Sequence, residues 1–129
     1  MLLRSAARHG SIRSEQMETY YHPADLNKFA EMGKGSRELW EKFSAYYEAV
    51  FAEGALSERE KALIALGVAH AVQCPYCIDA YTQACLEKGS NIEEMTEAVH
   101  VAFAIRGGAS LVHGVQMRNV AQKLTMGTK

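Results

Sequence analysis

Residues 56–89 read LSEREKALIALGVAHAVQCPYCIDAYTQACLEKG and carry the strongest fold signals in this 129-residue chain. Ser57 and Glu60 have the spacing of a capping box, which predicts the start of a helix. Residues 62–72 are apolar nearly all round, as expected for a helix in the centre of a bundle. The segment therefore predicts a buried helix that is followed at once by a second helix, which ends at Gly89.

The sequence on both sides of this segment is helical as well. A short helix is expected over residues 25–32, and a longer one over residues 36–53, where apolar side chains follow helical spacing. A further helix is predicted over residues 92–105, a break at Arg106-Gly107-Gly108, and a last helix over residues 109–124. No alternating pattern or hairpin signal indicates a strand. We therefore predict an all-α bundle of about six helices.

The chain divides into a short leader and one domain. Residues 1–16 have scattered small and basic side chains without a period, and we expect them to be disordered. Residues 17–129 are then a single domain. The apolar stripe of residues 39–51, added to an already crowded central helix, exceeds what one small bundle can bury. We therefore expect a homo-oligomer.

Composition limits the possible partners. The net charge is −1, which gives no electrostatic basis for binding nucleic acid. No apolar run approaches the roughly 20 residues of a membrane span, so no membrane partner is expected. The chain has three cysteines, an odd number, and no signal-peptide pattern. We expect a cytoplasmic protein.

Cys74 and Cys77 form a C-x-x-C pair, C-P-Y-C, at the predicted start of a helix. Pro75 suits the first helical position, which makes Cys74 an N-cap-like residue. Side chains three residues apart lie on one helix face, within reach of a disulfide. The positive end of the helix dipole favours a thiolate, and the second thiol can resolve an oxidised first one. The pair predicts thiol redox chemistry.

Other roles for the cysteines fit less well. A zinc site needs four ligands, and a second Cys/His pair with ligand spacing is missing, although His70 and a partner subunit could add two. A thioredoxin fold would place a strand before the pair, and none is predicted. Cys85 lies two turns beyond Cys77, too far to bridge to it, and reads as a small buried apolar residue. No metal and no cofactor is expected.

Two side chains near the pair are candidate site residues. His70 lies four residues before Cys74 and Tyr81 four residues after Cys77. His70 either tunes the thiols, as a base or as a cation, or is a hydrogen-bonded core residue. Tyr81 either donates a hydrogen bond to a thiolate or a bound peroxide, or packs with its hydroxyl in water. His100 and His113 are expected to be structural, although either could face the site.

Residues 56–89 and the sequence EEMTEAVHVAFAIRGGA at 93–109 resemble the carboxymuconolactone decarboxylase superfamily, in its alkylhydroperoxidase D-like branch. METYYHPADLNKFAEMG at 17–33 and SLVHGVQMRN at 110–119 resemble a narrower group, the arsenosugar biosynthesis-associated peroxidase-like proteins. The resemblance implies an all-α fold, assembly as a trimer or hexamer, and peroxidase chemistry without haem or metal.

The resemblance also assigns roles within the pair. It makes Cys77 the peroxide-attacking cysteine and Cys74 the resolving one, whereas the helix dipole alone favours Cys74 as the more acidic thiol. The sequence departs from the family's proton relay. Ala62 stands where a glutamate is expected, twelve residues before the first cysteine, and Tyr81 stands where a histidine is expected. His70 is the best substitute base on the preceding helix.

Three functions follow as alternatives. The first is a thiol-dependent peroxidase or disulfide reductase that cycles Cys74 and Cys77, with a peroxide or small disulfide as substrate and a thiol as electron donor. The second is a binding protein whose dithiol captures a soft ion or an arsenical without turnover, since soft thiolates suit such ligands. The third is an oligomeric scaffold whose pair is only redox-sensitive. Muconolactone decarboxylation is disfavoured, because the resemblance is to the C-x-x-C branch.

Overall fold

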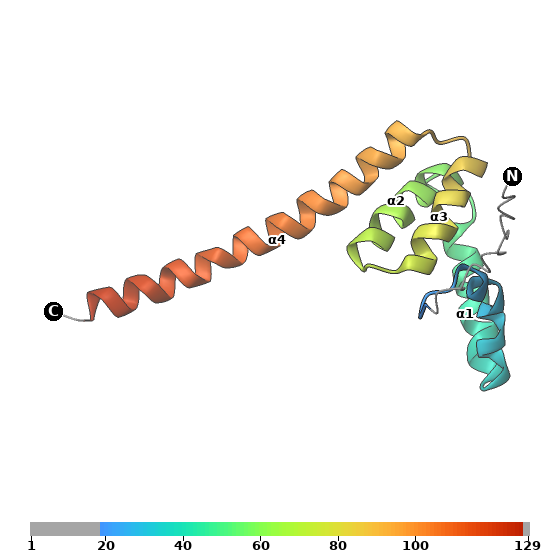
Figure 1. Cartoon of the computed structure of the whole chain (residues 1–129), viewed down its shortest axis with the longest axis horizontal. Coiled ribbons are helices and arrows are strands. Elements are labelled where there is room, and N and C mark those ends of the chain that lie inside the picture. The colour runs from blue at the N-terminus through green and yellow to red at the C-terminus, as the bar shows by residue number, and fades with distance from the viewer. Residues whose placement is uncertain (1–18, 128–129) are drawn as a thin grey trace, which may run out of the picture.

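The computed structural model describes residues 19–127 and contains five helices and no strand in that range. In chain order these are the 3-10 helix η1 and the α-helices α1 to α4, with bounds Pro23–Lys34, Arg37–Phe51, Glu58–Ala71, Pro75–Glu87 and Ile92–Met126. Helix α2 is central and packs against α3 and the first part of α4, while η1 lies along α1 (Figure 1). The predicted all-α class is confirmed. The predicted leader, residues 1–16, lies outside the described residues.

Both ends of the central segment are fixed by local polar contacts. The capping box predicted at Ser57 and Glu60 is confirmed, and Asn91 and Glu94 form a second one at the start of α4. In each box a carboxylate accepts a backbone N–H, and this bond is the main cause that lowers the pKa of Glu60 and of Glu94. Gly89 ends the turn after α3 with φ of +84°, a conformation that glycine adopts without steric cost.

The predicted break at residues 106–108 is wrong, and so is the count of six helices. Helix α4 runs without interruption for 35 residues through both glycines. Each glycine costs a helix about 1 kcal/mol, which good helix formers on either side can offset. In addition, the Arg106 guanidinium donates a hydrogen bond to the Ala71 carbonyl oxygen at 2.6 Å, where α2 ends. Arg106 therefore anchors α4 to α2 beside the glycines and satisfies a carbonyl that the end of α2 leaves open.

The hydrophobic core of the chain is small. Among the described residues, five apolar side chains are buried, all from α2, α3 or the start of α4: Ala62, Leu66, Ala69, Cys85 and Met95. Two ion pairs lie beside this core: Arg59 of α2 pairs with Glu94 of α4, and Glu58 of α2 pairs with Lys88 at the end of α3. Residues 62–72 were expected to be buried all round, yet Ile64, Val68 and Val72 are each more than half exposed. One face of α2 is therefore open in the single chain.

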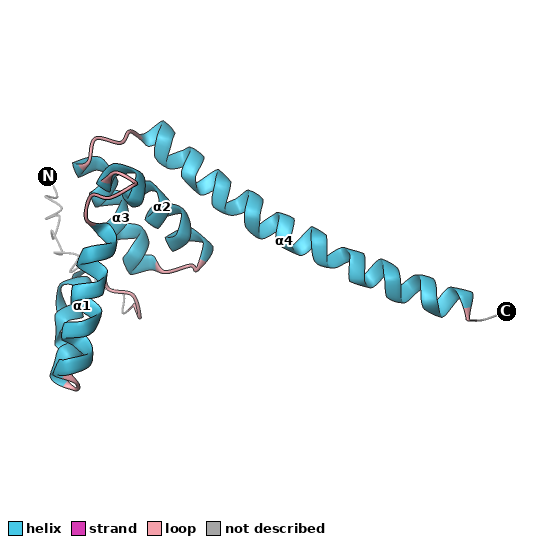
Figure 2. Cartoon of the chain, turned by 180° about the vertical axis from the view of Figure 1, so that it is seen from behind, coloured by secondary structure: helices cyan, strands magenta, loops and turns pink. Residues whose placement is uncertain are grey.

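Helix α4 leaves the other helices as a long arm. All residues from 109 to 126 are exposed except Gly114, which is partly covered. Figures 1 and 2 show the same arm from opposite sides, continuing straight beyond the ends of α2 and α3. By length and composition alone, α4 is also long and apolar enough to cross a membrane.

Gly33 offers a test of how η1 packs on α1. A Cβ atom added at Gly33 would lie 2.8 Å from Cγ of Trp40, whose ring packs edge-on against Phe29 at 5.0 Å. Gly33→Ala must therefore push Trp40 away, and we expect it to lower the free energy of unfolding by about 1–3 kcal/mol. Urea unfolding followed by fluorescence reports on this directly, because Trp40 is the single tryptophan. Gly35→Ala is the control, since a Cβ there meets nothing within 4 Å; equal losses in both variants would contradict this packing.

Candidate active site

The turn between α2 and α3 sets the position of the cysteine pair. Helix α2 ends at Ala71, and Gln73 then adopts φ of +57°, the left-handed region that favours glycine. The N–H of Cys74 donates to the Ala69 carbonyl at 3.1 Å, which closes the turn. Cys74 thereby becomes the N-cap residue of α3, with Pro75 in the first turn. The tight connection places both cysteines at the positive end of the α3 dipole.

Cys74 and Cys77 are joined by a disulfide, with their Cα atoms 5.2 Å apart. The N–H of Cys77 donates to Cys74 Sγ at 3.2 Å, so the sulfur of Cys74 takes the part that a serine or aspartate oxygen plays in other N-caps. The same N–H would stabilise a thiolate at Cys74 after reduction. The fold thus holds the pair in a geometry that allows the disulfide without backbone movement.

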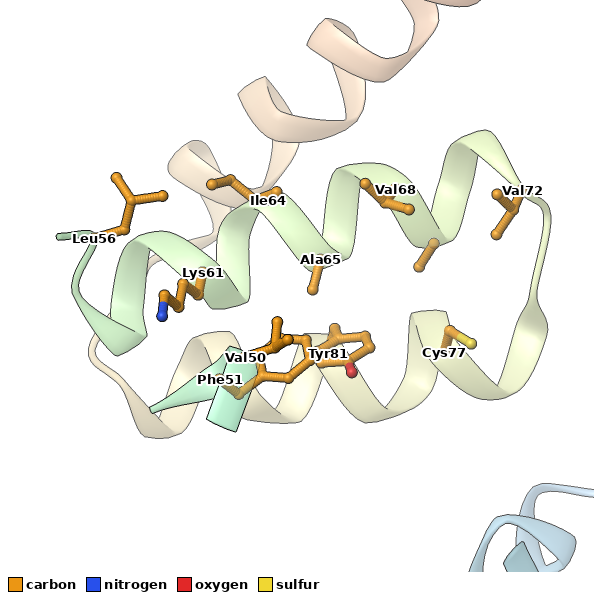
Figure 3. A pocket seen from close by; sticks show the side chains of 11 residues that line it. Val50, Phe51, Leu56, Lys61, Ile64, Ala65, Val68, Val72, Cys77 and Tyr81 are labelled. Carbon is orange, nitrogen blue, oxygen red and sulfur yellow. The ribbon is translucent and has the colours of Figure 1, made fainter. Parts of the chain in front are cut away.

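An apolar cavity of about 420 Å³ opens beside Cys77, between the end of α1 and the facing sides of α2 and α3 (Figure 3). Cys77 lines it, and Cys74 does not. The polar side chains in its wall are Lys61, whose ammonium group donates to the Ala52 carbonyl at 2.6 Å, and Tyr81. The remaining lining residues are Val50, Phe51, Leu56, Ile64, Ala65, Val68, Ala69 and Val72. A small molecule in this cavity would lie beside Cys77.

Tyr81 is brought to the same cavity as Cys77, one helical turn further along α3. Its ring stacks on Phe51 at a centroid distance of 5.3 Å and an interplanar angle of 21°. Phe51 in turn contacts Tyr47, the next ring of an aromatic row along α1. Tyr81 is therefore held by packing from its apolar side, and Figure 3 shows its ring between α2 and α3. Phe51 and Lys61 were missed as site residues; the helical spacing of the apolar stripe of α1 was the available signal for Phe51.

The structure does not bring His70 into the cavity of Cys77. Its Nδ1–H donates to the Leu66 carbonyl at 2.8 Å, and the ring lines a separate cavity with residues of α4, among them Ala102 and Arg106. Nearness in sequence to Cys74 was a poor guide, because position 70 falls on the side of α2 that faces α4. His100 and His113 lie exposed on α4, outside the Cys77 cavity of their own chain.

Given this placement, His70→Ala should leave the chemistry of the thiols unchanged. We expect the pH profile of Cys77 alkylation by iodoacetamide, measured after reduction, to match that of the unaltered chain. Loss of the ring should appear instead as a modest loss of stability, since it removes one side chain from the contact between α2 and α4. A shifted alkylation profile would show that the imidazole does reach the thiols.

A second feature that the sequence did not reveal is a contact to Tyr76, the residue just before Cys77. The Tyr76 hydroxyl donates to the Tyr20 carbonyl at 3.3 Å, and the rings of Tyr21 and Tyr76 meet at 5.6 Å. The segment before η1 therefore lies against the side chain between the two cysteines. Burial is the main cause that raises the pKa of Tyr76, so its hydroxyl stays a neutral donor at physiological pH.

The interior behind the pair is apolar. Ala62, where the resemblance led us to expect a glutamate, is buried against Leu66, Cys85 and Met95. Cys85 is a free thiol with no exposed surface, and its burial raises its pKa. Among residues 19–127 no group of three or more His, Cys, Asp or Glu side chains is placed to hold a metal ion. The site offers a dithiol, a phenol and apolar walls.

Residues 37–117, most of the described helices, match the carboxymuconolactone decarboxylase family. The chain belongs to this family. Its fold resembles a carboxymuconolactone decarboxylase family protein from Legionella pneumophila in the apo form, with a TM-score of 0.60, 33% identity, and coverage of 72% of this chain and 84% of that one. It also resembles a protein from Methanobacterium thermoautotrophicum, with a TM-score of 0.63, 36% identity, and coverage of 65% and 94%.

One curated relative comes from Paracoccus denitrificans, where it is named uncharacterized protein 4 in the cox locus. It is 40% identical over 87 residues, which cover 65% of this chain and 78% of the relative. The range that matches the family, residues 37–117, includes both α2 and α3, the helices on either side of the C-x-x-C pair. Membership is compatible with alkylhydroperoxidase-like chemistry, while the names of the relatives specify no substrate.

Proposed function

We propose that this family member is a thiol-dependent peroxidase or disulfide reductase that cycles between the Cys74–Cys77 disulfide and the dithiol. The observation that carries the proposal is the asymmetry of the pair: Cys77 lines an apolar cavity, and Cys74 sits behind it at the N-cap. A substrate in the cavity meets Cys77 first, and the resolving thiol is already within bonding distance. This supports Cys77 as the attacking cysteine.

The peroxidase cycle needs three steps. The Cys77 thiolate attacks one oxygen of a hydroperoxide, the O–O bond breaks, and the leaving oxygen takes up a proton to give an alcohol or water. Cys77 is then a sulfenic acid. The thiol of Cys74 attacks the Cys77 sulfur, water leaves, and the disulfide forms. A dithiol donor finally gives two electrons and two protons to restore both thiols and becomes a disulfide itself.

Residues around the pair have defined parts in this cycle. Tyr81 is proposed to donate a hydrogen bond into the cavity, where it can orient the peroxide or stabilise the Cys77 thiolate. The apolar walls favour a substrate with a hydrocarbon part, and a cavity of about 420 Å³ has the size of small-molecule sites in general. We therefore expect organic hydroperoxides to be preferred over hydrogen peroxide. No cofactor takes part in the proposed cycle.

The electron count tests this directly. The reduced protein should lose two thiols for each equivalent of cumene hydroperoxide and regain the Cys74–Cys77 disulfide, while Cys85 stays reduced. Thiol counting and mass spectrometry under denaturing conditions measure both. Turnover with dithiothreitol should be faster for cumene hydroperoxide than for hydrogen peroxide at equal concentration. If neither peroxide is consumed, the proposed peroxidase activity is contradicted.

The same geometry supports a second candidate, a dithiol binding protein for an arsenical or another soft ion. Two thiols with Cα atoms 5.2 Å apart can hold one trivalent arsenic atom without backbone movement. An arsenic-related role in the cytoplasm rests on the resemblance of residues 17–33 and 110–119 to the arsenosugar-associated group. Tight binding of phenylarsine oxide to the reduced pair, together with absent peroxide turnover, would favour this candidate.

A further inference from the structure

The wall of the Cys77 cavity contains a cation. Lys61 lines the cavity together with Tyr81, Cys77 and apolar side chains, and no acidic residue of the described chain lines it. Figure 3 shows Lys61 near one end of the row of lining side chains and Cys77 near the other. The cavity is therefore apolar along its length, cationic towards one end and reactive towards the other. Such a wall selects a ligand by its charge as well as by its hydrophobic part.

The positive charge of Lys61 is not neutralised by a neighbouring carboxylate. Its ammonium group donates a hydrogen bond to the Ala52 carbonyl, and within residues 19–127 it forms no ion pair. The three acids closest to it in sequence are bonded elsewhere: Glu58 to Lys88, Glu60 to Ser57, and Glu53 to the backbone N–H of Glu58. An ammonium group has three N–H donors, so two remain for a ligand.

The separation between Lys61 and the cysteine pair matches a hydrocarbon chain of moderate length. Lys61 and Ala69 both line the cavity from α2, and Ala69 lies beside the pair, since its carbonyl accepts the N–H of Cys74. The helix rises by roughly 12 Å between these two residues. An extended chain advances by roughly 1.2 Å per bond, so about ten bonds join the level of Lys61 to that of the pair.

We propose that the substrate is the hydroperoxide of a long-chain carboxylic acid, with its carboxylate on Lys61 and its –OOH group at Cys77. The carboxylate accepts the two remaining ammonium donors, and such charge-assisted bonds are strong beside apolar walls. The hydrocarbon between the two groups lies along Ala65 and Val68. The O–O bond then breaks as in the cycle above, and the product is the hydroxy acid. The reaction at Cys77 rests on the proposed function, whereas the carboxylate site does not.

Linoleic acid hydroperoxide and its methyl ester are a matched pair of substrates, because the ester lacks the negative charge. With dithiothreitol as donor, the unaltered protein should show a kcat/KM that is roughly tenfold higher for the acid. Lys61→Met should bring this ratio close to unity, and Lys61→Arg should keep most of it. Lys42→Met is the control, since it removes the same charge from an exposed ion pair on α1 and should leave the ratio unchanged. A ratio near unity in the unaltered protein, or equal falls in Lys61→Met and Lys42→Met, would overturn the proposal.

Binding to the oxidised protein tests the carboxylate site without chemistry. In equilibrium dialysis, decanoate should bind roughly tenfold more tightly than decanol, and Lys61→Met should remove the difference. If decanoate binds in this way and no peroxide is consumed, the proposed function fails and the carboxylate site stands. If peroxide is consumed but neither preference depends on Lys61, the proposed function stands and the substrate proposal fails. The lysine would then only tie Ala52 to α2.

Two further measurements test the orientation and the source of the ligand. In the reduced protein, decanoate anchored on Lys61 reaches Cys77 and should slow its alkylation by iodoacetamide several-fold. Hexanoate at equal occupancy ends short of the sulfur, and equal protection by both acids would overturn the orientation. Phosphatidylcholine hydroperoxide in vesicles bears no free carboxylate and should be reduced no faster than the methyl ester. Faster reduction of the vesicles than of the free acid would make a membrane lipid the substrate and overturn the proposal.

Discussion

Replacing Cys77 by serine is expected to lower peroxide turnover by at least about a thousandfold, because the substitution removes the reacting atom itself. Cys74→Ser should also stop turnover, but it should leave the first step intact. Peroxide added in one equivalent should then accumulate a sulfenic acid at Cys77, which a dimedone adduct and mass spectrometry detect. Cys77→Ser should react slowly and accumulate little adduct at Cys74.

Cys74→Ser is a well-matched variant for this comparison. Serine is among the preferred N-cap residues, and its hydroxyl can accept the Cys77 N–H that now bonds to Cys74 Sγ. The start of α3 should therefore survive the change. The dipole of α3 favours Cys74 as the more acidic thiol by only about 0.3–1 kcal/mol. A sulfenic acid trapped at Cys74 rather than Cys77 would show that acidity, and not access to the cavity, selects the nucleophile.

The largest effect on stability is expected from Leu66→Ala. Leu66 is 2% exposed at the centre of a core of five buried apolar side chains. Its truncation should lower the free energy of unfolding by about 2–5 kcal/mol, because the surroundings can collapse only in part. For a chain of this length the corresponding fall in Tm is roughly 10–20 °C. Thermal unfolding by circular dichroism at a fixed protein concentration measures it.

Ile64→Ala is the control on the same helix. Ile64 is 53% exposed in the single chain, so its truncation should cost the isolated chain much less than that of Leu66. If Ile64 is buried between subunits of the predicted homo-oligomer, its truncation weakens the association, and the loss of stability should grow with protein concentration. Equal losses for Leu66→Ala and Ile64→Ala at every concentration would contradict the small core described above.

The parts of the fold that sequence could predict are those that local chemistry decides. Ser57 and Glu60 cap one another within a single turn, so the start of α2 follows from four residues. Pro75 likewise needs no tertiary information to begin a helix, since its fixed φ suits the first turn. Beside the two glycines, α4 instead has a distant partner, the Ala71 carbonyl on α2 that Arg106 reaches. Two adjacent glycines, taken alone, suggested a break.

The candidate site also contains residues that the sequence could predict and residues that only the folded structure brings together. Cys74, Cys77 and Tyr81 lie on consecutive turns of one helix, so their spacing was enough to group them. The side of α2 that His70 occupies depends on how α2 packs between α3 and α4, which spacing alone did not fix. Phe51 comes from a different helix and meets Tyr81 only after folding. No local sequence pattern predicts a contact between these two helices.

The buried thiol of Cys85 can serve as a natural probe of local unfolding. With no exposed surface and a pKa raised by burial, it can react with a labelling reagent only when the contact between α2, α3 and α4 separates. Its rate of modification, divided by the rate in the denatured chain, gives the equilibrium constant of that opening. The reagent thus reads the free energy of the region directly behind the redox pair, in the native state and without denaturant. Blocking or oxidising Cys74 and Cys77 first leaves Cys85 as the sole thiol of the chain, so the signal needs no engineered probe.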